Sequence, residues 1–168
     1  DYGEYAITLV NSKNIFSMLN EFFNPQDAAM IYVISIVHFI NGFTYIKNIR
    51  DYFDMSILSL VFPSLKLGKE TVSNLYESLG SRQTSILKME ERLVKLSSGQ
   101  IAIDGHVIGS TSENNDLSEK GYKFKKIGEP QINLLMAYDI NSKTPLISRI
   151  YEGASNDKLS VKDFLNQT

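Results

Sequence analysis

The chain has 168 residues, of which 43% are hydrophobic, so it can form one ordinary domain or two small ones with a sizeable buried core. Its net charge of −2 excludes a polycation that coats nucleic acid indiscriminately. The absence of cysteine excludes disulfides, thiolate catalysis and cysteine-based zinc sites, and with only His38 and His106 a histidine zinc site is not expected either.

The longest apolar run, residues 28–40, contains Ser35 and His38 and is shorter than the roughly 20 residues that a membrane span needs. It predicts a buried helix and no association with a membrane. The N-terminus has no basic segment followed by an apolar one, which argues against a signal peptide. We expect a cytoplasmic, prokaryotic protein associated with the nucleoid. Because the chain opens at Asp1 without an initiator methionine, we also expect a trimmed piece of a longer protein.

Residues 1–99 have apolar residues at helical spacing and predict a helical N-terminal domain. Asn24 before Pro25 is typical of a helix start, and Asn41-Gly42 is typical of its end. Thr44 is expected to cap the next helix. The five helices expected from these signals cover residues 25–40, 44–53, 56–62, 65–80 and 82–97.

From Gln100 the apolar pattern changes to that of strands. Strands are expected over residues 101–109, 131–138 and 144–151, with a polar loop over residues 112–130. Residues 139–143 are expected to form a five-residue hairpin turn, and a helix is expected from Lys158 to Asn166. The fold class is α+β: the helical domain is followed by the first part of an α/β core, residues 100–168, with three mostly antiparallel strands and a helix. This second half is too small for an independent core and predicts an incomplete sheet.

Asp104 interrupts the apolar run of the first expected strand. In an extended chain its side chain points to the same face as Ala102, and a carboxylate on a rigid strand suits a hard divalent cation. The alternative from the residues alone is a structural role, in which Asp104 accepts hydrogen bonds from backbone amides and Gly105 makes a turn.

A resemblance to a known family favours the metal. Asp104-Gly105 is followed by Ser110 and Ser112, by Gly121-Tyr122-Lys123, and by Gln131-Ile132-Asn133. Thr144-Pro145-Leu146, Tyr151-Glu152-Gly153 and Asp157 come next. In this order, residues 100–168 resemble the start of the catalytic domain of DDE-type insertion-sequence transposases, which have an RNase H-like fold.

The resemblance implies metal-dependent cleavage of double-stranded DNA and strand transfer at insertion-sequence ends. Asp104 would be the first carboxylate of an acidic triad that holds two Mg²⁺ ions. The second Asp and the Glu have no counterpart in the chain, because Asp139, Asp157 and Asp163 do not match their positions. The 168-residue chain alone is therefore expected to be inactive, with its magnesium site empty.

Residues 62–80 are similar to a helical segment that precedes the catalytic domain in these transposases. This segment also suits the second helix of a helix-turn-helix, whose polar residues near the N-terminus could reach DNA bases. The alternative is a capped helix in a packing bundle, since the first half has no basic stripe. The candidate DNA contacts in this helix are Lys69, Thr71, Ser73 and Asn74.

A lysine-rich segment follows the first strand and lies beside two aromatic residues, Tyr122 and Phe124. Such a segment could neutralise phosphates in a salt-dependent way, although charged runs more often form a solvated loop. Its candidate DNA contacts are Lys120, Lys123, Lys125 and Lys126.

Two further residues are expected near Asp104 in supporting roles. His106 lies two residues later on the same face of the strand and could hydrogen-bond a scissile phosphate or orient a water, or could be structural. Arg149 on the third strand could pair with a carboxylate on the sheet face. Two other interpretations stay open: a DNA-binding or dimerisation module without activity, associating through the unpaired edge of the sheet, and an RNase H-like nuclease that does not join strands.

Overall fold

The computed structural model describes residues 2–110, 112, 115–121, 128–155 and 157–166. The fold is α+β and divides into two compact units, Asp1–Met89 and Glu90–Thr168. Sequence patterning places a boundary at residues 99–100, whereas the units divide inside helix α7 (Gln83–Leu96). The reason is that Leu93 and Val94, in the second half of this helix, pack against the sheet.

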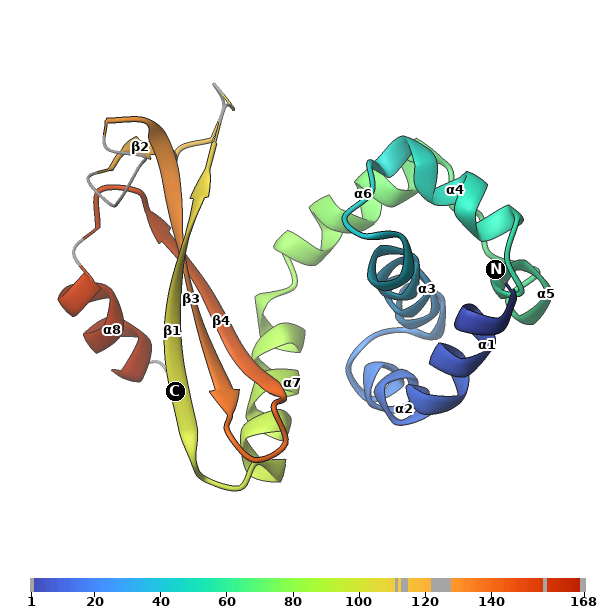
Figure 1. The fold of residues 1–168 in the computed structure, drawn as a ribbon, viewed down its shortest axis with the longest axis horizontal. Coiled ribbons are helices and arrows are strands. Elements are labelled where there is room, and N and C mark those ends of the chain that lie inside the picture. Colours follow the sequence, from blue (N-terminus) through green and yellow to red (C-terminus); the bar gives the residue numbers. More distant parts are fainter. Residues whose placement is uncertain (1, 111, 113–114, 122–127, 156, 167–168) are drawn as a thin grey trace. The chain divides into compact units, whose positions relative to one another are not determined.

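The first unit is helical, as its apolar periodicity predicts, and α3 forms its centre (Figure 1). Helices α1, α2 and α4 pack around α3, in which Val33 and Val37 are completely buried. A helix covered on most sides is apolar nearly all round, which explains the long apolar run. The helices of this unit, besides the first part of α7, are α1 (Tyr2–Asn11), α2 (Lys13–Phe22), α3 (Pro25–Asn41), α4 (Ile46–Asp54), α5 (Leu58–Val61) and α6 (Lys69–Gly80).

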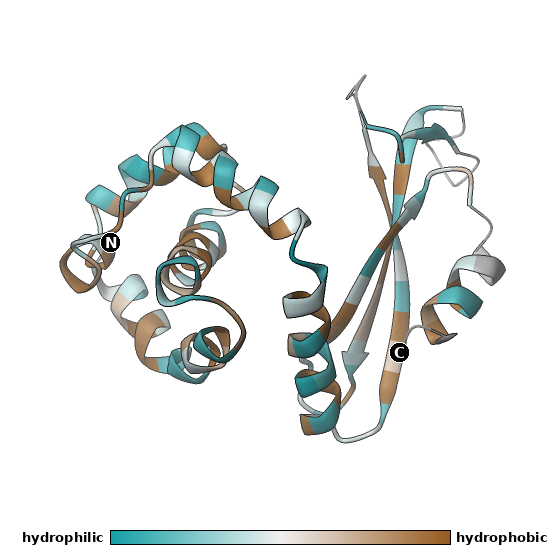
Figure 2. Ribbon diagram, turned by 180° about the vertical axis from the view of Figure 1, so that it is seen from behind, coloured by the Kyte–Doolittle hydropathy of each residue, from teal (hydrophilic) through white to brown (hydrophobic). Residues whose placement is uncertain are grey.

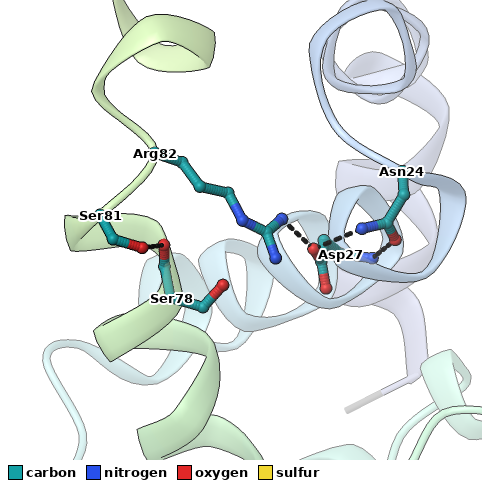
Figure 3. Close-up of polar contacts among 5 residues, drawn as sticks. All are labelled: Asn24, Asp27, Ser78, Ser81 and Arg82. Atoms are coloured by element: carbon teal, nitrogen blue, oxygen red, sulfur yellow. Dashed lines mark hydrogen bonds and ion pairs between the residues drawn. The ribbon is translucent and has the colours of Figure 1, made fainter.

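The start of α3 confirms the expected cap and adds an ion pair (Figure 3). Asn24 Oδ1 accepts a hydrogen bond from the backbone N–H of Asp27 at 2.9 Å, and Pro25 occupies the first helical turn. Asp27 Oδ2 accepts from Asn24 Nδ2 at 2.6 Å and also pairs with the Arg82 guanidinium. Arg82 lies in the turn between α6 and α7, so this pair fixes that turn to the beginning of α3.

One expected helix cap differs from the structure, whereas the expected end of a helix at residue 80 agrees with it. Thr44 does not cap α4: Tyr45 holds the N-cap position without a side-chain bond, and the Thr44 N–H donates to His38 Nδ1 at 3.3 Å. Gly80 is the last residue of α6, and Ser81 follows it with φ −86° and ψ −10°. Because this backbone is right-handed, the helix end does not require glycine.

No single described helix is both long and apolar enough to span a membrane. Only α3 and α4 taken together, bent by 91° at their junction, meet that test of length and composition.

The second unit contains a four-stranded sheet centred on β3 (Pro130–Asp139). Strand β1 (Ile101–Gly109) pairs antiparallel with β3 over its whole length, and β4 (Pro145–Glu152) pairs antiparallel with β3 on the other side. The two-residue strand β2 (Glu119–Lys120) also pairs with β3, and it lies inside the segment expected to be a loop. The three longer strands and the helix α8 (Asp157–Asn166) agree with the sequence prediction.

The two faces of the sheet are covered differently. On β3 the odd-numbered residues are buried, and Leu135 and Ala137 pack with Ile147 of β4 and Phe164 of α8. The even-numbered residues of β3 from Ile132 to Tyr138 are only half-buried, although they are apolar too. Figure 2 shows hydrophobic stretches along the strands, interrupted by hydrophilic residues. Apolar residues on both faces are typical of a sheet that is covered on both sides.

Asp139 ends β3 and organises the turn that follows. Its carboxylate accepts from the Ser98 hydroxyl, from the Ser142 hydroxyl at 2.8 Å and from the Ser98 backbone N–H at 3.2 Å. The hydrogen bonds from Ser98 and then Ser142 lower the pKa of Asp139 to about 2, because they favour the charged form. This aspartate ties the end of α7 to the β3–β4 hairpin.

Candidate functional site

Asp104 lies in the middle of β1, and its side chain is exposed to solvent. Its Oδ1 accepts a hydrogen bond from the backbone N–H of Gly105 at 2.9 Å. The carboxylate therefore does not bear the cost of burial that its apolar neighbours in the sequence suggest. It is open to solvent and to a ligand.

The register of the sheet defines the surroundings of Asp104. Asp104 lies opposite Met136 of β3, which lies opposite Ser148 of β4, so the three side chains share one face. This is the face with half-buried apolar residues on β3. Asp104 is thus an acidic group at the border of an apolar surface.

His106 lies on the same face as Asp104, opposite Leu134, and is exposed. Arg149 does not. It lies opposite Leu135, which lies opposite Gly105, so its side chain starts from the other face of the sheet. Its guanidinium binds Glu90 of α7, and it is therefore directed at a helix carboxylate and not at Asp104.

The four candidate DNA contacts of α6 do not form one surface. Lys69 and Asn74 are exposed, whereas Thr71 and Ser73 are half-buried beside the core residues of the helix. Of the four, Lys69 and Asn74 are the side chains most open to a partner.

Among the lysines expected to contact phosphate, Lys120 is exposed on β2, where it lies opposite Pro130. Lys123, Lys125 and Lys126 lie outside the described residues. The spatial relation between this segment and Asp104 therefore stays a prediction.

Two structural features of this unit escape the sequence prediction. The first is Glu90, which is 7% exposed and binds Arg149. It falls in the apolar stripe of α7 at helical spacing from Ile86 and Leu93, and a charge in such a stripe is a readable signal of a buried pair.

The second feature is a pair of buried amide side chains, Gln131 and Asn133, near the start of β3. Asn133 Nδ2 donates to the Glu152 carbonyl at 2.9 Å, and Gln131 Nε2 donates to the Gly153 carbonyl at 3.4 Å. The side-chain oxygens of Gln131 and Asn133 are buried and have no hydrogen-bond partner within the described part of the chain. Gln131 and Asn133 are two residues apart and therefore share one face of the strand. This spacing is the signal of a buried amide pair that the sequence alone offers.

The first unit has a groove of about 630 Å³ between α1, α2 and α3. Ile7, Ile15 and Phe39 form apolar walls, and their side chains are 64%, 48% and 79% exposed. Ser12 and Tyr32 form a polar contact at its border, with 2.8 Å between their hydroxyl oxygens. None of the residues predicted as functional lines it.

No group of three or more His, Asp or Glu side chains that could hold a metal occurs among the residues that the structure describes. Comparisons with protein-family models, with curated proteins and with solved structures found no match for the chain.

Proposed function

We propose that this chain is part of a DDE-type transposase with an RNase H-like core, which cleaves double-stranded DNA and transfers strands at insertion-sequence ends. The observation that carries the proposal is the position of Asp104: an exposed carboxylate at the centre of the edge strand β1. The ordered motifs from Asp104 to Asp157 support the same assignment.

The sheet topology is compatible with this proposal. Strands β1 and β4 are both antiparallel to β3, so they are parallel to each other. A strand that followed α8 and ran parallel to β4 could therefore pair with the free edge of β1. Its carboxylate would then lie beside Asp104, where the triad needs it.

The described residues do not by themselves fit a two-magnesium site. Asp104 supplies a single carboxylate, and a Mg²⁺ ion held by one carboxylate keeps most of its waters and binds weakly. We expect the 168-residue chain to be inactive and to depend on carboxylates from a longer protein.

The test is a DNA cleavage and strand-transfer assay on the longer protein, comparing Asp104→Asn with the control Asp51→Asn, an exposed aspartate on α4. We expect Asp104→Asn to abolish both activities and Asp51→Asn to retain them. Because Asp104 is exposed, its substitution should change the free energy of unfolding by less than about 0.5 kcal/mol. Cleavage by the Asp104→Asn protein would refute the proposal. Cleavage without joining in the unsubstituted protein would favour the nuclease.

A second candidate, a DNA-binding module without activity, is favoured by the exposure of Lys69 and Asn74 on α6. It predicts that the 168-residue chain binds duplex DNA and that Lys69→Ala reduces the salt dependence of binding by about one counterion. Fluorescence anisotropy with labelled duplex at several salt concentrations measures both. No binding at low salt would exclude this candidate without affecting the transposase proposal.

A further inference from the structure

Asn41 and Gly42 form the one Asn–Gly pair in the sequence, and they lie at the end of α3. Asn41 is the last residue of the helix, and Gly42 is its C-cap with φ 69° and ψ −175°. An asparagine followed by glycine readily loses its side-chain amide, because the next backbone nitrogen can attack the amide carbon. Glycine favours this attack since it has no side chain and a mobile backbone.

The attacking nitrogen is not held by the helix. The residues that follow α2, α4, α5 and α6 donate their backbone N–H groups to carbonyls of the preceding turn. The Gly42 N–H makes no such bond among the described residues, and a Cβ built at this position would meet nothing within 4 Å. The nitrogen is therefore available, and the space beside residue 42 is open.

The amide that would be lost ties α1 to α3. Asn41 Nδ2 donates to the hydroxyl oxygen of Tyr5 in α1 at 2.6 Å and to the Val37 carbonyl oxygen one turn back at 2.9 Å. Tyr5 is buried in the core of the first unit, whereas Asn41 is exposed to water. These two hydrogen bonds slow the attack without preventing it, because the last residue of a helix frays.

We propose that Asn41 is a site of non-enzymatic deamidation and that its conversion loosens α1 from α3. The Gly42 N–H gives its proton to hydroxide, and the nitrogen bonds to Asn41 Cγ. Nδ2 takes a proton from water and leaves as ammonia, which closes a five-membered succinimide ring. Water then opens the ring, giving aspartate by addition at Cγ or isoaspartate by addition at the backbone carbonyl carbon. The net change is gain of a water and loss of an ammonia, with no oxidation or reduction.

Aspartate at residue 41 removes the contacts that the amide makes. A carboxylate has no N–H to donate, so the Val37 carbonyl loses its side-chain donor and faces a negative charge. This charge lies at the C-terminus of α3, where the helix dipole disfavours it. Only the Tyr5 hydroxyl can adapt, by donating where it otherwise accepts. The tie between α1 and the end of α3 is thereby weakened.

Isoaspartate disturbs the loop beyond the helix. His38 holds this loop: the Thr44 N–H donates to Nδ1 at 3.3 Å, and the Phe43 ring stacks on the imidazole with 4.9 Å between the ring centroids. In isoaspartate the chain gains a backbone carbon between these residues and His38, which displaces both contacts. Both products therefore act on the same end of α3. The inference does not rest on the proposed function, since it concerns the first unit alone.

The first experiment follows the folded 168-residue chain by peptide mapping and mass spectrometry during incubation in mildly alkaline buffer. Asn11 is the internal control, because it is exposed and ends α1, but the N–H of the next residue, Ser12, donates to the Thr8 carbonyl at 3.0 Å. We expect aspartate and isoaspartate at residue 41, and a rate at Asn11 about tenfold lower, as an engaged N–H and a side chain at the next residue require. Equal rates at Asn41 and Asn11 would overturn the proposal.

The second experiment tests the role of the Tyr5 contact. Tyr5→Phe removes one acceptor of Asn41 Nδ2 and should accelerate deamidation about two- to tenfold, the value of one hydrogen bond. Tyr32→Phe is the matched control, because the Tyr32 hydroxyl bonds to Ser12 and to the Leu9 carbonyl and not to residue 41. It should leave the rate at Asn41 unchanged. Equal acceleration by both changes would refute the assigned role of Tyr5.

The third experiment measures the effect of the product without the reaction. Asn41→Asp should lower Tm by a few degrees and speed amide hydrogen exchange in α1, while exchange in β3 of the second unit stays the same. Asn41→Gln, which cannot close a five-membered ring, should show no modification at residue 41. Unchanged Tm and α1 exchange in Asn41→Asp would overturn the link between deamidation and the docking of α1.

Discussion

Arg149 and Glu90 form a nearly enclosed ion pair that joins β4 to α7. Arg149 Nη1 lies 2.7 Å from Glu90 Oε2 and 2.9 Å from Glu90 Oε1, and the Ser148 N–H donates to the same carboxylate at 3.2 Å. The two side chains are 19% and 9% exposed. Their main role is to hold the helix against the outer edge of the sheet.

Removing one partner of this pair should be costly. Arg149→Met leaves the Glu90 carboxylate with one backbone donor in a nearly buried position, and we expect a loss of about 3 kcal/mol in the free energy of unfolding. Urea denaturation followed by circular dichroism measures it. A matched control is Arg50→Met, which breaks an exposed i,i+4 pair with Asp54 and should cost less than about 1 kcal/mol.

The double variant Glu90→Leu/Arg149→Met separates burial from pairing. With both charges removed, no uncompensated charge remains, so the double variant should be more stable than Arg149→Met alone. If the stability loss of the double variant equalled the sum of the losses in Glu90→Leu and Arg149→Met, the two side chains would not be coupled.

Asp139 should make stability depend on pH in the acid range. Its folded pKa of about 2 lies below the ordinary value, so its contribution is complete above about pH 4 and disappears as pH falls through about 2. The stability difference between the unsubstituted chain and Asp139→Asn should therefore shrink between pH 4 and pH 2. Urea denaturation at several pH values gives both curves.

Ser142→Ala tests the cause of the lowered pKa of Asp139. It removes one hydroxyl that donates to the Asp139 carboxylate, at 2.8 Å, and should raise the pKa of Asp139 and move the loss of stability to higher pH. An unchanged pH profile in Ser142→Ala would contradict the hydrogen-bond explanation.

Local signals predicted most of the elements. Asn24 before Pro25 predicted the start of α3 because capping and a preset φ act within one turn, and apolar segments typical of strands, in which side chains alternate between the two faces, predicted β1, β3 and β4. The same alternation placed Asp104 and His106 on one face. These features depend on neighbours in the sequence.

Features that depend on distant contacts were not predictable. The two-residue strand β2 exists because Gln131 and Pro130 pair with it, and no periodicity can be read from two residues. Arg149 was expected near a carboxylate, but only the packing of α7 shows that Glu90 is the one. The exposure of Asp104 depends on which face the helices leave open.

The Asn24 cap of α3 should contribute measurably to stability. Asn24→Ala removes the acceptor for the Asp27 N–H and the amide that donates to Asp27, and should cost about 1 kcal/mol. Asn24→Ser keeps a capping oxygen and should lose less. Thermal unfolding of the two variants compares them, and equal losses would indicate that the cap has no role.

Gly153 is the position where a methyl group should be least tolerated. A Cβ at this residue would lie 1.9 Å from the Gln131 carbonyl oxygen and 2.6 Å from that of Glu119, both backbone atoms of the sheet. The β2–β3 ladder or the chain after β4 must move to accept it. Gly153→Ala should therefore cost about 3 kcal/mol or prevent the second unit from folding.

Gly80→Ala is the matched control, because a Cβ at this last residue of α6 meets nothing within 4 Å. Alanine also restricts the unfolded chain, so this change should be neutral or stabilise by up to about 1 kcal/mol. Urea denaturation of both variants measures the contrast. A Gly153→Ala protein as stable as Gly80→Ala would show that Gln131 and β2 do not pack against residue 153.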